Sequence, residues 1–205
     1  MKDNDEKENT FKIIGLTGGV GAGKSSVLAW LKEAYGAHII VTDEVGHRLM
    51  EPGKASYERL VDAYGTDILG EDGTILRDKL AKIVFQNEES VKKVNEMVHP
   101  LVKTEVEREI ASVRMRGEVS YVVVESALLK EGGLTECCDE IWYLYASTEV
   151  RIQRLMTSRG YTKERCLSVM DRQLSDTAFR EIADAVIDNS GDFDDTKRQI
   201  ARLLG

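Results

Sequence analysis

The stretch that most constrains this chain runs from Gly18 to Ser25 and reads GGVGAGKS. Its spacing, G-x-x-x-x-G-K-S, is that of the phosphate-binding P-loop, with an apolar run before it and an amphipathic helical pattern after it. A strand, a glycine loop and a helix in this order bring backbone N–H groups and the positive end of a helix dipole to one point. The alternative is a glycine-rich turn before an ordinary helix, but four fixed positions arise by chance in roughly one such chain in a hundred. The stretch therefore predicts a nucleoside triphosphate site.

The residue types within the P-loop predict separate roles. Lys24 places a positive charge near the β- and γ-phosphates, and the Ser25 hydroxyl is suited to bind Mg²⁺. The backbone of the loop and of the first helical turn is expected to hold ATP. The residues assigned to this contact are Gly18, Gly21, Ala22, Gly23, Lys24, Ser25 and Ser26.

Strand and helix patterns alternate along most of the chain, which predicts an α/β fold with a parallel sheet covered on both faces. The expected strands cover residues 11–16, 38–42, 119–124, 140–145 and 185–188. One expected helix begins at Ser26, and another begins after Thr148, which is its expected N-cap. The other expected helices cover 54–64, 78–85, 90–116, 161–183 and 194–204. Pro100 is expected to separate or kink two helices within 90–116.

The same patterns divide the chain into a core, an insertion and a tail. Residues 11–42 and 118–205 form the expected nucleotide-binding core, with a lid at about 148–180. Residues 43–117 are mostly helical and exceed an ordinary crossover between strands, so they predict a helical substrate-binding insertion. Residues 1–10 are polar and predict a disordered tail.

Composition narrows the class of partner. The chain has 205 residues and a formal net charge of −8, which argues against nucleic acid and membrane surfaces as partners. The first ten residues lack the pattern of a signal peptide, and no apolar run reaches membrane-spanning length. Three cysteines match neither a disulfide framework nor a metal site, so they are interpreted as small half-buried side chains. We expect a cytoplasmic monomer or small homo-oligomer acting on a small molecule.

Two acidic residues close predicted strands at the edge where ligands bind in such sheets. Asp43 suits either of two roles, a helix N-cap or the base that accepts the proton of an attacking hydroxyl during phosphoryl transfer. Glu125 either contacts Mg²⁺ through water or simply ends its strand with a polar group.

Basic residues beyond the fourth strand predict a lid. Individually they suit a solvated helix face, but together they predict a segment that closes on ATP and neutralises phosphoryl charge. Arg154 and Arg159 are selected from the group Arg151, Arg154, Arg159, Arg165, Arg172 and Arg180. In the insertion, His99 and Arg77 suit either structural hydrogen bonds or contact with an anionic substrate.

An ordered series of stretches from about Ile13 to Leu204 resembles the dephospho-coenzyme A kinases. Four of them carry most of the resemblance: GLTGGVGAGKS at 15–25, VTD at 41–43, HPL at 99–101 and IDNSG at 187–191. The P-loop alone indicates only a nucleotide, whereas the ordered set is far more specific.

The resemblance implies a P-loop kinase core with a coenzyme A-binding insertion and a lid. It also implies the last step of coenzyme A synthesis, in which ATP phosphorylates the ribose 3′-hydroxyl of dephospho-coenzyme A. By the same resemblance, Asp43 matches the catalytic carboxylate, Arg154 lies in the lid, and Asn189 borders the adenine. His99 and Arg77 fall in the substrate domain, and Leu128 belongs to a loop expected over the substrate.

Four positions depart from the family pattern, namely Val41, His47, Ala127 and Glu125. They bear on the contacts to the substrate more than on the reaction. Two other functions stay open at this point. A P-loop kinase for a nucleoside or nucleotide would share the core and differ in its acceptor. A switch protein such as a guanine-specific GTPase would carry N-K-x-D, which is absent from the sequence.

Overall fold

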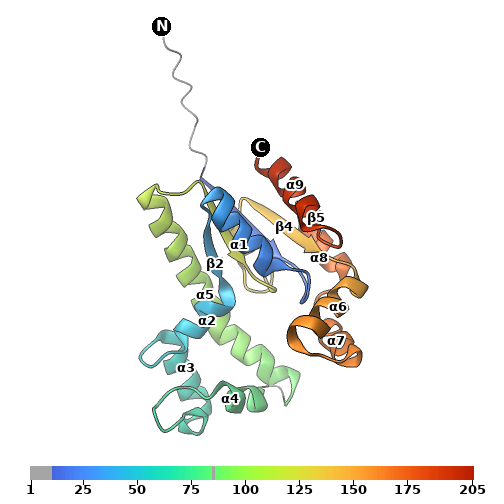
Figure 1. Ribbon diagram of the computed structural model, residues 1–205. Coiled ribbons are helices and arrows are strands. Elements are labelled where there is room, and N and C mark those ends of the chain that lie inside the picture. Colours follow the sequence, from blue (N-terminus) through green and yellow to red (C-terminus); the bar gives the residue numbers. More distant parts are fainter. Residues whose placement is uncertain (1–10, 85) are drawn as a thin grey trace.

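The computed structural model describes residues 11–84 and 86–205, so the tail predicted at 1–10 and the predicted helix end at Phe85 lie outside the described residues. Within them, the strands form one five-stranded parallel sheet in the order β2-β3-β1-β4-β5. The bounds are β1 (Lys12–Thr17), β2 (His38–Val41), β3 (Tyr121–Glu125), β4 (Glu140–Tyr145) and β5 (Ala185–Asp188). The predicted fold class is confirmed (Figure 1).

The two faces of the sheet are buried by different helices. Along β3, Val123 faces the cluster formed with α1 (Lys24–Tyr35) and α9 (Phe193–Leu204), whereas Val122 and Val124 face the cluster formed with α5 (Glu88–Arg116). This alternation follows from the two-residue period of a strand. A near-continuous apolar run such as the one in β3 is typical of a parallel strand that is covered on both sides.

The insertion has a small core of its own. Leu60, Ile68 and Leu80 are buried there, and partly buried side chains from the first half of α5 pack against them. The elements before α5 are α2 (Thr42–Leu49), α3 (Ala55–Tyr64), the 3-10 helix η1 (Thr66–Ile68) and α4 (Arg77–Val84). The second half of α5 packs on the sheet instead, through residues including Val106 and Ile110. One helix therefore joins the insertion to the core.

Three local predictions are wrong in whole or in part. Pro100 does not separate two helices, because α5 continues through it and its packing against two cores outweighs the lost backbone hydrogen bond, whereas the predicted kink stays a prediction. The N-cap of α6 (Thr148–Arg159) is Ser147, whose hydroxyl accepts a hydrogen bond from the Val150 N–H. The helix predicted at 161–183 is two helices, α7 (Lys163–Met170) and α8 (Asp176–Ile182), each with its own N-cap.

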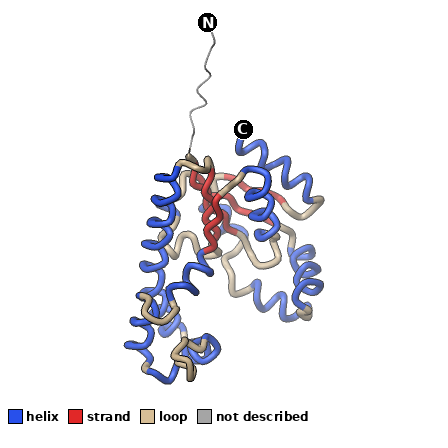
Figure 2. The backbone as a smooth tube through the Cα atoms, turned by 60° about the vertical axis from the view of Figure 1, so that its left-hand side comes forward, coloured by secondary structure: helices blue, strands red, loops and turns tan. Residues whose placement is uncertain are grey.

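The helices of the insertion and the helices α6 and α7 lie on opposite sides of the carboxyl edge of the sheet (Figures 1 and 2). Figures 1 and 2 show α2, α3 and α4 on one side and α6 and α7 on the other. The carboxyl edge of the sheet therefore lies between two groups of helices, and this is the edge at which ligands bind in such folds.

Within residues 11–84 and 86–205, no helix is both long and apolar enough to span a bilayer.

Candidate active site

The P-loop joins β1 to α1 and opens into a cleft of about 940 Å³. Within the described residues, no side chain caps α1, and the Ser26 N–H donates to the Gly23 carbonyl at 3.1 Å. The N-terminus of this helix, with its positive dipole end, faces the cleft and suits an anion. Gly23 precedes the helix with a φ of 98°, and a Cβ at this position would collide with the side-chain amide of Asn189. Glycine is therefore required both for the backbone conformation and for the close approach.

Lys24 and Glu125 meet in the wall of this cleft. Lys24 Nζ donates to the Gly18 carbonyl at 2.7 Å and lies 3.5 Å from Glu125 Oε1. Glu125 is placed there by its strand, because its backbone is in register with Leu16 on one side and Val41 on the other. Burial raises the pKa of Glu125 above its usual value, and the positive charge of Lys24 opposes this only in part.

Arg154 and Asn189 hold the P-loop through hydrogen bonds to its backbone. The Arg154 guanidinium donates to the Ala22 carbonyl at 3.1 Å and to the Asn189 carbonyl at 2.8 Å. The Asn189 side chain is buried, donates to the Ala22 carbonyl at 2.7 Å and accepts from the Thr196 hydroxyl at 2.8 Å. In this structure the side chain of Asn189 is thus bound to the loop and to α9. Arg154 also lines the cleft, together with Arg159 from the end of α6.

A clamp on Val20, which sequence reasoning missed, is formed by Arg151 and Gln173. Arg151 Nε donates to the Val20 carbonyl at 2.8 Å, and Gln173 Oε1 accepts from the Val20 N–H at 2.9 Å. Arg151 Nη2 also donates to Gln173 Oε1 at 3.1 Å, which closes the arrangement. A Cβ on Gly19 would collide with the Arg151 guanidinium, so the loop and the clamp are fitted to each other. Arg151 was in the predicted arginine group but was not selected from it.

Replacing Arg151 with lysine is expected to lower kcat/KM for ATP by about tenfold, mainly through KM. Lysine keeps the charge but lacks the planar guanidinium that reaches Val20 and Gln173 in a fixed geometry. The loop therefore loses its hydrogen bond from position 151, and Gln173 loses the one that orients it. Steady-state kinetics with varied ATP provide the measurement. The control is Arg172→Lys, which changes an exposed arginine next to Gln173. Equal effects of the two substitutions would contradict the clamp.

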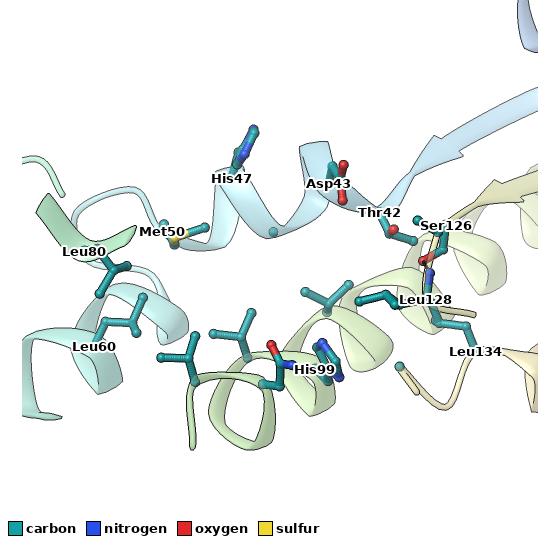
Figure 3. A pocket seen from close by; sticks show the side chains of 17 residues that line it. Thr42, Asp43, His47, Met50, Leu60, Leu80, His99, Ser126, Leu128 and Leu134 are labelled. Carbon is teal, nitrogen blue, oxygen red and sulfur yellow. Dashed lines mark hydrogen bonds between the residues drawn. The ribbon is translucent and has the colours of Figure 1, made fainter. Parts of the chain in front are cut away.

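A second, apolar pocket of about 290 Å³ lies between α2 and α5 (Figure 3). Asp43 and His47 of α2 belong to its lining, and His99 lies opposite on α5. His99 Nδ1 is 3.2 Å from the Glu131 carbonyl oxygen, so its ring is tied to the loop after β3. Leu128, from the same loop, lines the pocket and is partly exposed.

The two cavities share one boundary. Asp43 and Ala127 line both the P-loop cleft and the apolar pocket. Asp43 holds this place because α2 begins at Thr42, directly after β2, and so its first turn lies at the carboxyl edge of the sheet. A carboxylate between a phosphate cradle and a second pocket can act on a group held in that pocket.

Neither Arg77 nor Arg48 belongs to the lining of the apolar pocket. Arg77 Nη1 is 2.9 Å from His47 Nε2, at the N-terminus of α4. Arg48 Nη2 donates to Glu109 Oε2 at 3.3 Å, and Glu109 also contacts His38 at 2.8 Å. Arg77 is therefore linked to the wall of the pocket through His47.

Comparison with known proteins identifies the family. The model of the dephospho-CoA kinase family matches residues 12–195. The chain belongs to the dephospho-CoA kinase family. The dephospho-CoA kinase of Carboxydothermus hydrogenoformans is 38% identical over 192 residues, which is 94% of this chain and 92% of the relative. That of Geobacillus kaustophilus is 38% identical over 191 residues, covering 93% and 94% of the two chains.

Solved structures agree with the fold of a dephospho-CoA kinase. The crystal structure of TT1252 from Thermus thermophilus has a TM-score of 0.79 at 29% identity, covering 95% of this chain and 97% of the other. The dephospho-CoA kinase from Campylobacter jejuni has a TM-score of 0.68 at 18% identity, covering 94% of each chain. A shikimate kinase from Acinetobacter baumannii, with a TM-score of 0.53 at 15% identity, shares the fold alone. The dephospho-CoA kinase resemblance predicted from the motifs is confirmed.

Proposed function

We propose that this dephospho-CoA kinase transfers the γ-phosphoryl group of ATP to the ribose 3′-hydroxyl of dephospho-CoA. The observation that carries the proposal is the shared boundary, where Asp43 lines both the P-loop cleft and the apolar pocket. ATP is assigned to the cleft and the acceptor to the pocket. Holding both in fixed positions removes much of the entropic cost of bringing the reacting groups together.

Asp43 is proposed as the general base. Its carboxylate accepts the proton of the acceptor hydroxyl as that oxygen attacks the γ-phosphorus. Its position in the first turn of α2 suits an acid, because the helix dipole stabilises a negative charge there. The other role considered from the sequence, that of N-cap, is not observed, since Val41 is the residue before the helix.

Positive charge around the phosphates is assigned to Lys24, Arg154 and Arg159. All three line the cleft, and Lys24 already donates to the P-loop at Gly18. These charges stabilise the negative charge on the transferring phosphoryl group. Because α6 already contacts the P-loop through Arg151 and Arg154, closure of the lid is assigned to the segment beyond α6, where it would exclude water. Asn189 is assigned to the same site as a support of the loop beside the nucleotide.

The cleft also suits Mg²⁺. Ser25 offers a hydroxyl, and Glu125 and Asp43 offer carboxylates, all from residues that line the same cleft. These are the hard oxygen donors that Mg²⁺ prefers, and it usually combines one or two of them with phosphate oxygens and water. We assign Ser25 as its direct ligand and Glu125 as a contact through water. When bound, Mg²⁺ neutralises charge on the phosphate oxygens.

The apolar pocket is assigned to the acceptor, with His99 and Leu128 as contacts. Arg77 is assigned to an anionic group of the acceptor at the pocket margin, where its present partner His47 is exposed. The His47 and Ala127 departures lie in this pocket wall, whereas the P-loop matches the family motif.

An acceptor panel tests the proposal. ADP release is followed by a coupled assay with dephospho-CoA, nucleosides and nucleoside monophosphates, and phosphorus NMR locates the new phosphate. We expect kcat/KM to be at least about a hundredfold higher for dephospho-CoA than for the other acceptors. Preference for a nucleoside or its monophosphate would instead assign the chain to another small-molecule kinase activity. Tight GTP binding without phosphorylation of any acceptor would indicate a switch protein.

A further inference from the structure

Two adjacent thiols lie outside the site described above, where the 3-10 helix η2 (Thr135–Cys137) leads into β4. Both are half-buried free cysteines. Cys137 Sγ donates to the Leu134 carbonyl at 3.0 Å, and Cys138 Sγ donates to the same oxygen at 3.3 Å. Neighbouring side chains on a regular strand point to opposite faces. Here the turn of η2 instead brings both sulfurs to one oxygen.

A cavity gives access to this pair. It has a volume of about 360 Å³, and its wall includes both cysteines together with Ile13, Ile110 and Arg114. The third cysteine, Cys166, is fully buried in α7 and does not belong to this wall. A hydrogen bond from Cys138 lowers the pKa of the Cys137 thiol, which favours the nucleophilic thiolate at that sulfur.

We propose that Cys137 and Cys138 form a dithiol site for a trivalent organoarsenical, and that its occupation weakens acceptor binding. A disulfide between adjacent residues is strained by the geometry that an S–S bond requires. An arsenic atom needs no S–S bond, because it accepts one bond from each sulfur. Two As–S bonds form, the As=O bond breaks, and the oxygen leaves as water with the two thiol protons. Arsenic stays trivalent, so no oxidant or reductant takes part.

The link to the acceptor runs through Leu134. Its side chain lines the apolar pocket, and its carbonyl is the acceptor for both thiols. Its N–H donates to the Leu129 carbonyl at 2.8 Å, which holds the segment after β3 together. Cys138 Sγ is also packed close to Gly15 in β1. Binding of arsenic removes both S–H donors from the Leu134 carbonyl, which keeps the backbone N–H of Cys137 at 3.3 Å, and therefore loosens one wall of the pocket.

Mass spectrometry with phenylarsine oxide tests the site without reference to activity. One equivalent is added to the full chain in its reduced form, and the intact mass is followed by tryptic mapping under non-reducing conditions. Cleavage after Lys130 and Arg151 places both thiols on the peptide 131–151, whereas Cys166 falls on 166–172. We expect one phenylarsenic group on 131–151. No adduct, or an adduct on 166–172, would overturn the proposal.

Thiol competition and cysteine variants test chelation by both sulfurs. The adduct of the unmodified sequence is expected to survive excess 2-mercaptoethanol and to be removed by 2,3-dimercaptopropanol. Cys137→Ser and Cys138→Ser are each expected to make it removable by the monothiol, whereas Cys166→Ser leaves it unchanged. Circular dichroism establishes that each variant is folded. Removal by the monothiol from the original sequence would overturn the dithiol site, even if no variant folds.

Kinetics of the adduct test the link to the pocket, and this part rests on the proposed acceptor. KM for dephospho-CoA is expected to rise roughly threefold to tenfold, the range for losing one or two weak hydrogen bonds, with KM for ATP unchanged. Equal KM values for dephospho-CoA before and after treatment would overturn the link. An untreated enzyme that ignores dephospho-CoA would contradict the proposed function, and the mass measurement would still decide the site.

Discussion

Asp43→Asn is expected to lower kcat by about 10²-fold to 10⁴-fold, the usual contribution of a positioned general base. Asparagine keeps the size of the side chain at the boundary of the two cavities but cannot accept the hydroxyl proton. ATP affinity should stay near its original value, because the cradle for the phosphates is built from the P-loop. Rapid-quench turnover and calorimetric ATP titration measure the two quantities separately.

The matched control for Asp43 is Glu44→Gln. Glu44 is the next residue in the first turn of α2 and lines the P-loop cleft, but it does not line the apolar pocket. Removing its charge changes the field at the phosphates by a comparable amount without touching the boundary. We expect kcat to change little in this variant. If Asp43→Asn retained near-normal turnover, or if both variants lost activity equally, the assignment of Asp43 would be wrong.

Lys24→Met is expected to lower kcat by about 10²-fold to 10³-fold and to weaken ATP binding as well. Methionine has a similar length but removes the charge that contacts Gly18 and Glu125. The substitution also affects Glu125. Burial raises the pKa of this carboxyl, and the positive charge of Lys24 partly opposes that increase. Without Lys24 the pKa of Glu125 should rise further, so that a larger fraction of this carboxyl is protonated and unable to support a cation.

The matched control for Lys24 is Lys32→Met, in the last turn of the same helix. Lys32 lines the same cleft, but it lies at the opposite end of α1 from the loop. The net charge of the protein changes by the same amount in both variants, so a general electrostatic effect would appear in both. Calorimetric titration with ATP and turnover at saturating acceptor compare them. Similar losses in the two variants would contradict a specific role for Lys24.

The elements that could be predicted from the sequence are those with strong local patterns. The strands at 140–145 and 185–188 were predicted with the bounds that the structure has. The P-loop was placed correctly between a strand and a helix, because its glycines and the flanking apolar runs carry their information within about twenty residues. Errors arose where long-range packing overrides local preference, as at Pro100, which is held inside α5 by two separate cores.

In the candidate site, too, features set by local patterns could be predicted, whereas contacts between distant segments could not. Asp43 and Glu125 could be placed together from the sequence, because parallel strands bring their carboxyl ends to one edge. The clamp on Val20 could not be predicted, although Arg151 belonged to the predicted group of arginines. Gln173 is 153 positions from Val20 in the sequence. It lies in the loop between α7 and α8, which the predicted helix at 161–183 did not contain.

By itself, the sequence determined the phosphate-binding loop, the alternating fold and the family, since each depends on residue types at short or ordered spacings. Only the tertiary structure decided which arginines hold the P-loop, where the side chain of Asn189 lies, and that Asp43 lines two cavities. The physical reason is the reach of the side chains. Backbone periodicity is set by neighbours along the chain. A long arginine side chain instead donates hydrogen bonds to the carbonyl groups that the folded chain brings within its reach, and these can come from distant parts of the sequence.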